Sequence, residues 1–150
     1  MSVPAIVAPE ILPLPVARKL LHEYRIRRLP VVDQSGALVG IVTEGDINRI
    51  SSSPGSDYDA YNLYYRVADL PLREFMSRPV ITVTPDTPLF EAAHLMLTWR
   101  IHGLPVAQGN EVVGMISVSD MLRRLLASGN PVSRTVSERK LSARQRSDRA

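Results

Sequence analysis

The sequence predicts an α/β fold made of two copies of one β-α-β-β-α unit, and two internal matches support this prediction. The segment RIRRLPVV at residues 25–32 returns as RIHGLPVA at residues 100–107, an offset of 75. Further on, GALVGIVTEGDI at residues 36–47 matches NEVVGMISVSDM at residues 110–121, where the shared glycine and aspartate are offset by 74. Repetition at a nearly fixed period indicates that one structural unit is used twice.

Each unit is expected to begin with a short strand followed by a helix. We expect the strands at about residues 5–8 and 80–83, and the helices at about 14–25 and 88–100. Thr87 is expected to cap the second of these helices, with proline at its first position. The apolar side chains of that helix have the spacing of one buried face, namely Leu89, Ala92, Ala93, Met96 and Trp99.

Two β-rich runs follow in each unit, and each pair is expected to form a hairpin. They are LPVVD and ALVGIVT in the first unit, and LPVA and EVVGMIS in the second. The offset drops from 75 to 74 in the connecting turn, DQSGA against QGNE, where a change of length is tolerated. A last helix is expected just after Thr43 and just after Ser117. This order predicts two small sheets covered by helices.

The composition is typical of a soluble globular protein. The chain has 150 residues, of which 45% are hydrophobic and 22% charged, which suits two half-size units that share a core. The absence of cysteine excludes disulfides, cysteine-based zinc sites and thiol nucleophiles. The N-terminal residues are interrupted by prolines and lack a basic start, and no apolar run is long enough to span a membrane. We therefore expect a cytoplasmic protein without a membrane segment.

We divide the chain into two repeats, a linker and a tail: repeat 1 at 1–50, linker at 51–78, repeat 2 at 79–127 and tail at 128–150. In the linker, Tyr58, Tyr61 and Tyr65 have the spacing of one helix side, and packing is favoured over a ligand surface. The tail carries six basic and two acidic residues, so the rest of the chain has a net charge of −1. We expect a disordered, solvated tail; contact with nucleic acid or an anionic partner is the alternative.

This ordered set of elements, occurring twice between residues 4 and 127, resembles a pair of cystathionine-β-synthase (CBS) domains, also called a Bateman module. The resemblance implies two repeats packed with pseudo-two-fold symmetry, commonly in a disc-like homodimer. It also implies that AMP, ADP, ATP or S-adenosylmethionine binds between the repeats as a regulatory ligand. Occupancy would be relayed to an unidentified partner protein. The expected class is therefore a nucleotide-binding, energy-sensing regulator and not an enzyme; the alternative is a dimerisation or docking scaffold of the same fold with empty clefts.

The first candidate binding residues lie at the two strand-to-helix junctions. A helix N-terminus offers free N–H groups and partial positive charge to a phosphate, and a carboxylate three residues later suits ribose hydroxyls. The resemblance implies the same roles for the hydroxyl and the carboxylate. The pattern also fits a simple helix cap, so both interpretations stay open, although two copies favour the ligand. The residues are Thr43, Asp46, Ser117, Ser119 and Asp120.

The second candidate set precedes and opens the LPV strands. In the family, residues at this place often contact phosphate, and arginine is suited to multidentate contact. Histidine at this place would bind phosphate well only when protonated. Alternatively, the two arginines are solvated residues that complement a helix dipole, and both interpretations stay open. The set comprises Arg27, Arg28, Leu29, Pro30, His102, Gly103, Leu104 and Pro105.

The third set would form a slot for adenine, with backbone groups at the edge of the base and aliphatic side chains on its faces. It comprises Ile6, Val7, Ile81, Thr82 and Val83. The first repeat lacks the polar residues of the second at this edge, so we expect the two clefts to differ. No catalytic motif is present, and the three histidines lack metal-ligand spacing. We therefore expect no metal and no catalytic residue.

Overall fold

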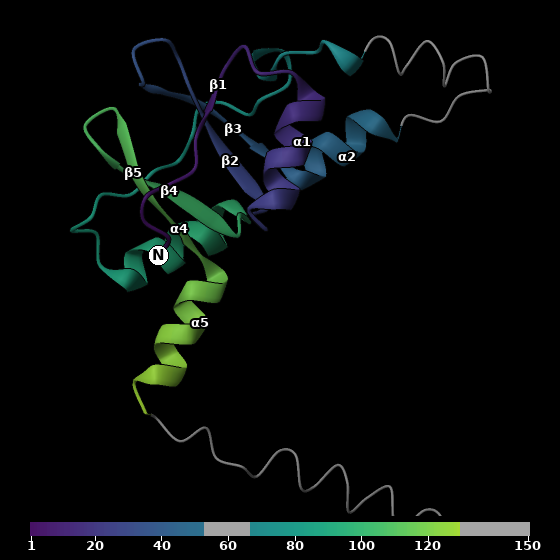
Figure 1. Ribbon diagram of the computed structural model, residues 1–150. Coiled ribbons are helices and arrows are strands. Elements are labelled where there is room, and N and C mark those ends of the chain that lie inside the picture. Colours follow the sequence, from purple (N-terminus) through teal and green to yellow (C-terminus); the bar gives the residue numbers. More distant parts are fainter. Residues whose placement is uncertain (53–66, 130–150) are drawn as a thin grey trace, which may run out of the picture. The chain divides into compact units, whose positions relative to one another are not determined.

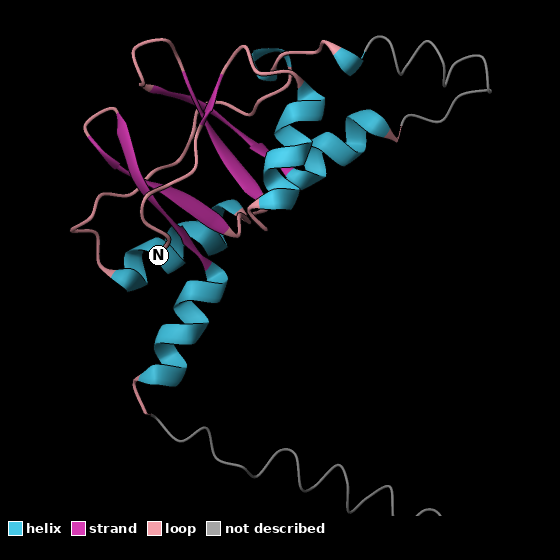
Figure 2. Ribbon diagram, viewed as in Figure 1, coloured by secondary structure: helices cyan, strands magenta, loops and turns pink. Residues whose placement is uncertain are grey.

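The computed structural model describes residues 1–52 and 67–129, and both halves contain the expected series of elements (Figures 1 and 2). The α/β class with repeated β-α-β-β-α units is confirmed. The elements of the first half are β1 (Ala8–Pro9), α1 (Leu14–Glu23), β2 (Arg28–Val32), β3 (Leu38–Thr43) and α2 (Glu44–Ser51). After a 3-10 helix at Leu72–Glu74, the second half contains α4 (Leu89–Trp99), β4 (Gly103–Gln108), β5 (Glu111–Ser117) and α5 (Val118–Ala127).

The chain divides into two compact units, Met1–Val118 and Ser119–Ala150, and each is described by itself. The first unit holds both sheets. The predicted tyrosine stripe at Tyr58, Tyr61 and Tyr65 and nearly all of the basic tail lie outside the described residues. In the described part of the chain, no helix is both long and apolar enough to cross a bilayer.

The two hairpins have the same register. Arg28 pairs with Thr43 at the open end of the first hairpin, and Gly103 pairs with Ser117 at the open end of the second. The ladder is irregular after Val31 in the first hairpin and after the equivalent residue in the second. The offsets read from the sequence therefore correspond to equivalent places in space.

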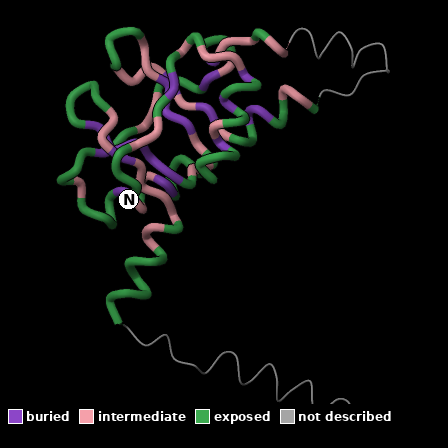
Figure 3. Tube along the Cα trace, in the orientation of Figure 1, coloured by how far each residue is buried: buried purple, intermediate pink, exposed green. Residues whose placement is uncertain are grey.

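The core lies along these hairpins, where most of the buried positions gather (Figure 3). In the first half, β2 and β3 pack against the inward side of α1 and α2. Leu72 and Met76 also belong to this core, so the segment directly before the second repeat helps to fill the first one. The buried members of the cluster are Ala8, Leu14, Ala17, Leu21, Leu29, Val31, Val42, Ile47, Leu72 and Met76.

The first strand of each repeat is shorter than expected. In place of residues 5–8 and 80–83, the structure has Ala8–Pro9 and a single parallel bridge at Val83. The Val83 N–H donates to the carbonyl of Pro105 at 3.1 Å, so this edge of β4 faces the first strand. Proline has no N–H to donate on that same edge, and the ladder therefore cannot extend toward earlier residues.

The helix ends also differ from expectation. α1 and α4 end before Arg25 and Arg100, because both arginines take the left-handed conformation with φ of 52°. A left-handed residue just after a helix is a common way to end it. At the start of α4 the expected cap is wrong, since Pro88 occupies the N-cap position. The Thr87 hydroxyl instead accepts a hydrogen bond from the N–H of Thr84 at 3.0 Å.

Each repeat is completed by a short segment that leads into the other repeat. Ser77, just before the second repeat, exchanges backbone hydrogen bonds of 2.9 and 3.1 Å with Ile41 of β3. Ser2, at the start of the first repeat, exchanges bonds of 2.9 and 3.1 Å with Met115 of β5. These contacts are equivalent under the repeat offsets, so the two lead-in segments are exchanged between the sheets.

The same exchange explains two glycines in the strands. A Cβ on Gly40 would lie 2.7 Å from Cγ of Met76, and a Cβ on Gly114 would lie 3.2 Å from Sδ of Met1. Met1 and Met76 are equivalent residues, and each crosses the glycine of the opposite sheet. The glycines are therefore required for the close approach of the lead-in segments.

We predict that Gly40→Ala destabilises the protein by about 1–3 kcal/mol, because the added methyl group overpacks against Met76. In a Met76→Ala background, the same substitution should reduce stability by less than about 0.5 kcal/mol. Urea denaturation of the four proteins of this double-mutant cycle measures the difference.

Gly45→Ala is the matched control, since a Cβ there would meet only the Thr43 hydroxyl at 3.6 Å. Alanine is favoured over glycine within a helix, so this control should stabilise the protein by up to about 1 kcal/mol. Equal losses from Gly40→Ala with and without Met76 would show that the exchanged contact is not responsible.

Candidate functional site

The junction between β3 and α2 contains a closed capping box. The Thr43 hydroxyl accepts from the N–H of Asp46 at 3.2 Å and donates to Asp46 Oδ2 at 2.7 Å, while the Thr43 N–H donates to the same oxygen at 2.9 Å. Asp46 Oδ1 accepts from Arg49 Nη2 at 2.8 Å. Asp46 is buried, whereas the Arg49 side chain is 74% exposed. The helix-cap interpretation is therefore realised, and one carboxylate oxygen is held only by an exposed arginine.

The first and second candidate sets meet in both repeats. The N–H of Glu44, the first residue of α2, donates to the carbonyl of Arg27 at 3.0 Å. In the second repeat, the N–H of Val118 donates to the carbonyl of His102 at 3.1 Å. Ser117 is paired with Gly103 at the start of β4, so this hydroxyl-bearing residue lies close to His102, the basic residue directly before Gly103. Each helix start and each approach to an LPV strand thus form one local site.

Ser119 and Asp120 belong to the second compact unit. Within that unit, Arg123 Nη1 lies 3.2 Å from Asp120 Oδ1, which repeats the i,i+3 pair seen between Arg49 and Asp46. Asp120 therefore has the same kind of arginine partner on its helix as Asp46. A shared role for the two aspartates in one cleft stays a prediction.

Arg28 of the first repeat lies against Gly103 of the second, and these two residues are equivalent. A Cβ on Gly103 would lie 3.0 Å from Nη1 and 3.3 Å from Cδ of Arg28, and 3.1 Å from the carbonyl oxygen of Ile116. Arg28 is half-buried, and this burial, followed by repulsion from Arg27, lowers the pKa of its guanidinium. Glycine at position 103 leaves the room that this side chain occupies.

The remaining residues of the second set differ in accessibility. Arg27 and His102 are exposed, so both can reach a ligand from solvent. The four apolar residues that follow are buried in the core and can offer a ligand only their backbone groups. They are Leu29, Pro30, Leu104 and Pro105.

Alternation along the first strands divides the third set into buried and exposed side chains. Ile6 and Ile81 are partly buried and Val83 is buried, whereas Val7 and Thr82 are exposed. Val7 and Thr82 are equivalent, and each lines one of two pockets between the repeats. The structure therefore brings only these two predicted residues to a pocket, and it does not bring the helix starts there.

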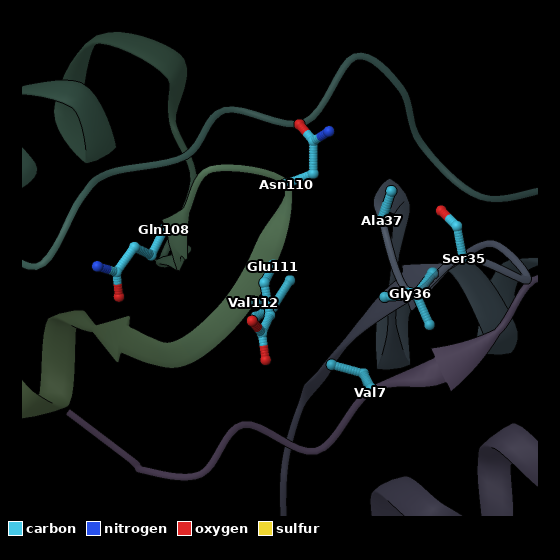
Figure 4. A pocket seen from close by; sticks show the side chains of 9 residues that line it. Val7, Ser35, Gly36, Ala37, Gln108, Asn110, Glu111 and Val112 are labelled. Carbon is cyan, nitrogen blue, oxygen red and sulfur yellow. The ribbon is translucent and has the colours of Figure 1, made fainter.

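The larger pocket, of about 550 Å³, lies between the turns of the two hairpins (Figure 4). Its lining comprises Val7, Val32, Ser35, Gly36, Ala37, Gln108, Asn110, Glu111 and Val112. The smaller pocket, of about 360 Å³, has the equivalent place on the other side, with Leu38, Val39, Pro79, Val80, Thr82, Ala107, Gly109 and Asn110 around it. The turn residues were not among the predicted site residues, although the change of turn length was a visible signal in the sequence.

Among the described residues, no group of three or more histidine, aspartate or glutamate side chains is placed to hold a metal ion.

Comparison with known proteins agrees with this geometry. The family model described as "CBS domain" matches residues 1–53 and 72–127. A CBS domain-containing protein of Dictyostelium discoideum is 33% identical over 120 residues, which cover 79% of this chain and 83% of that protein. Other curated relatives are longer: the chain spans 60% of a 17.7 kDa protein of Acidianus ambivalens and 26% of a protein of Methanocaldococcus jannaschii.

Two solved structures show the same arrangement. The CBS domain pair of protein MJ0100, in complex with 5′-methylthioadenosine and S-adenosylmethionine, is 31% identical with a TM-score of 0.67; the match covers 83% of this chain and 93% of that one. CBSX2 in complex with AMP is 23% identical with a TM-score of 0.68, covers 82% and 88% of the two chains, and shows the fold alone. With its two repeats, its equivalent hairpins and the family match over both, the chain belongs to the CBS domain family as a tandem CBS-domain protein.

Proposed function

We propose that this chain is a regulatory module that binds an adenosine-containing ligand between its CBS repeats, with Arg28 as the main phosphate contact. The half-buried Arg28 carries this proposal. Within residues 1–52 and 67–118, no ion pair engages its guanidinium. Partial burial of a charge without an opposite charge is unfavourable, and a bound phosphate would relieve it.

The surroundings of Arg28 support an anionic ligand. Arg27 adds a second positive charge, and its repulsion contributes to the lowered pKa of Arg28. An anion between the two guanidinium groups would replace this repulsion by attraction. Arg28 also lies over Gly103 in the second repeat, so a ligand bound to it would contact both repeats. Occupancy would thereby be sensed by the whole pair.

The ribose role of Asp46 is compatible with its capping box. Oδ2 is used by Thr43, but Oδ1 is held only by the exposed Arg49. An exposed ion pair contributes only about 0–1 kcal/mol, so ribose hydroxyls can replace Arg49 without opening the cap. We therefore keep Asp46, and by repetition Asp120, as ribose contacts.

Ligands of other family members support an adenosine group. The MJ0100 pair was solved with methylthioadenosine and S-adenosylmethionine, and CBSX2 was solved with AMP. All three ligands contain adenosine, and only AMP carries a phosphate. Because two arginines approach the site here, we expect this chain to prefer AMP, ADP or ATP over S-adenosylmethionine.

A second candidate role, dimerisation, is supported by α4. Phe90 and Leu97 are 73% and 79% exposed on this helix. The equivalent helix α1 carries Pro15 and His22 at these places, so this pair of exposed apolar side chains has no counterpart on α1. Exposed apolar side chains two turns apart suit burial against another helix. We propose a cytoplasmic homodimer that modulates a partner protein.

We predict that AMP raises the melting temperature and that Arg28→Gln weakens AMP binding about tenfold to one-hundredfold. A hydrogen bond to a charged group contributes about 1.5–3 kcal/mol, which corresponds to this range. Methylthioadenosine has no phosphate, so its affinity should change less than threefold. Calorimetric titration of both ligands measures the two ratios.

Arg73→Gln is the matched control, because Arg73 is an exposed arginine that pairs with Glu74 and lines neither pocket. It should leave both affinities unchanged. Failure of AMP, ADP, ATP and S-adenosylmethionine alike to stabilise the protein at millimolar concentration would rule out the ligand-binding proposal.

We predict that Asp46→Ala lowers the free energy of unfolding by about 1–2 kcal/mol, because the capping box is lost. It should also weaken both AMP and methylthioadenosine at least tenfold, since both ligands carry the ribose. Urea denaturation and calorimetry separate these effects.

Thr43→Val serves as a comparison that removes the cap hydroxyl and keeps the carboxylate. It should reduce stability similarly and retain most of the methylthioadenosine affinity. A stability loss in Asp46→Ala with unchanged ligand affinity would leave Asp46 as a helix cap alone and would favour the dimerisation scaffold.

A further inference from the structure

The larger pocket lies at the opposite end of the strands from the proposed phosphate contact. Val32 lines it, while Arg28 stands four residues earlier on the same strand, a separation of about 13 Å. None of the residues at the two helix starts lines this pocket. Of the candidate nucleotide-binding residues it shares Val7 alone, so it is distinct from the phosphate contact and from the helix starts, and it needs its own ligand.

The wall of the pocket is held in one conformation. The carboxylate of Asp33 accepts bonds from the N–H of Ser35 at 2.8 Å, from its hydroxyl at 2.6 Å and from the N–H of Ala37 at 3.0 Å. The N–H of Leu38 donates to the carbonyl of Asn110 at 3.0 Å, which ties the two turns together. A wall fixed in this way offers a preformed pocket, as small-molecule sites commonly do.

The two pockets provide an internal comparison. They occupy equivalent places, yet the turn of the first repeat is one residue longer and supplies Ser35, Gly36 and Ala37 to the larger pocket only. The residue equivalent to Ala37 in the second repeat is Glu111, which also lines the larger pocket. The smaller pocket has no ionisable residue in its lining. The extra residue and the carboxylate have thus made one of the two pockets distinct.

The lining predicts the chemistry of the ligand. Glu111 is its single ionisable residue, and no basic residue accompanies it. In Figure 4, Glu111 and Val112 lie between the hairpins, Val7 approaches from the facing segment, and Gln108 points away. The negative charge disfavours phosphates and favours a cation, while the three valines of the lining suit a short hydrocarbon chain.

We propose that the larger pocket binds a small organic cation, an ammonium or guanidinium group on a short aliphatic chain, with its charge at Glu111. This inference goes beyond the proposed nucleotide site and does not depend on it. A volume of about 550 Å³ accommodates a molecule of this size.

The test is a titration of the ¹⁵N-labelled full chain with agmatine, followed by amide chemical shifts, with 1-butanol as the uncharged probe. We expect saturable shifts at Gly36, Ala37, Asn110 and Val112, with a Kd on the order of 1 mM for agmatine. Butanol should bind at least fivefold more weakly. Absence of saturable shifts at these four amides up to 20 mM agmatine would overturn the proposal.

Glu111→Gln keeps the shape of the pocket and removes its charge, so it should weaken agmatine at least threefold and leave butanol unchanged. Glu91→Gln, an exposed glutamate on α4, is the matched control and should have no effect. Equal agmatine affinity in wild type and Glu111→Gln would contradict the assignment of the charge.

Arg28→Gln separates the two sites. It should weaken AMP binding and leave agmatine binding intact. Shifts of the four amides with AMP and not with agmatine would assign the pocket to the nucleotide.

Discussion

The exchange of the lead-in segments is the constraint on which the rest of the molecule depends. Ser2 is bonded to β5 of the second repeat, and Ser77 is bonded to β3 of the first. Neither sheet is therefore complete without residues that lead into the other repeat. Because Met76 is buried in the core of the first repeat, separating the repeats would expose apolar surface as well as backbone groups. The surfaces between the repeats thus have a fixed geometry before any ligand arrives.

A second consequence of this arrangement is that equivalent residues meet. Position 28 of the first repeat and position 103 of the second face each other, and two large side chains could not share the space that Arg28 fills over Gly103. Two arginines there would also place like charges together in a partly buried environment. The duplicated fold therefore favours unequal residues where the repeats touch, and the asymmetry of the proposed nucleotide site follows from packing.

The sequence predicted the order of elements, the hairpins and the equivalence of the two strand-to-helix junctions, because the offsets of 75 and 74 report equivalent places directly. It could not predict that Arg28 lies over Gly103, since the offset says which residues are equivalent and not which ones touch. The first strand is short because Pro105 lacks an N–H on the edge of β4 that faces it. The sequence alone does not show toward which edge of the sheet that missing N–H would point. The exchanged segments do have a signal in the sequence, because Met1-Ser2-x-Pro4 returns in Met76-Ser77-x-Pro79 at the offset of 75.

The two ends of the central strands differ in their charged residues. At the open end, Arg27 and Arg28 lie beside a helix start that also carries Glu44 and Asp46, whereas the turn end presents Asp33 and Glu111 with no basic residue in the pocket lining. Under the two proposals, an anionic group would bind at the arginines and a cationic group at Glu111, at different ends of the same hairpins. Since Leu38 is bonded to Asn110 and Arg28 contacts Gly103, each end also joins the first repeat to the second. Under the two proposals, a ligand at either end would thus act on the same interface between the repeats, and the fold would have two means of regulating it.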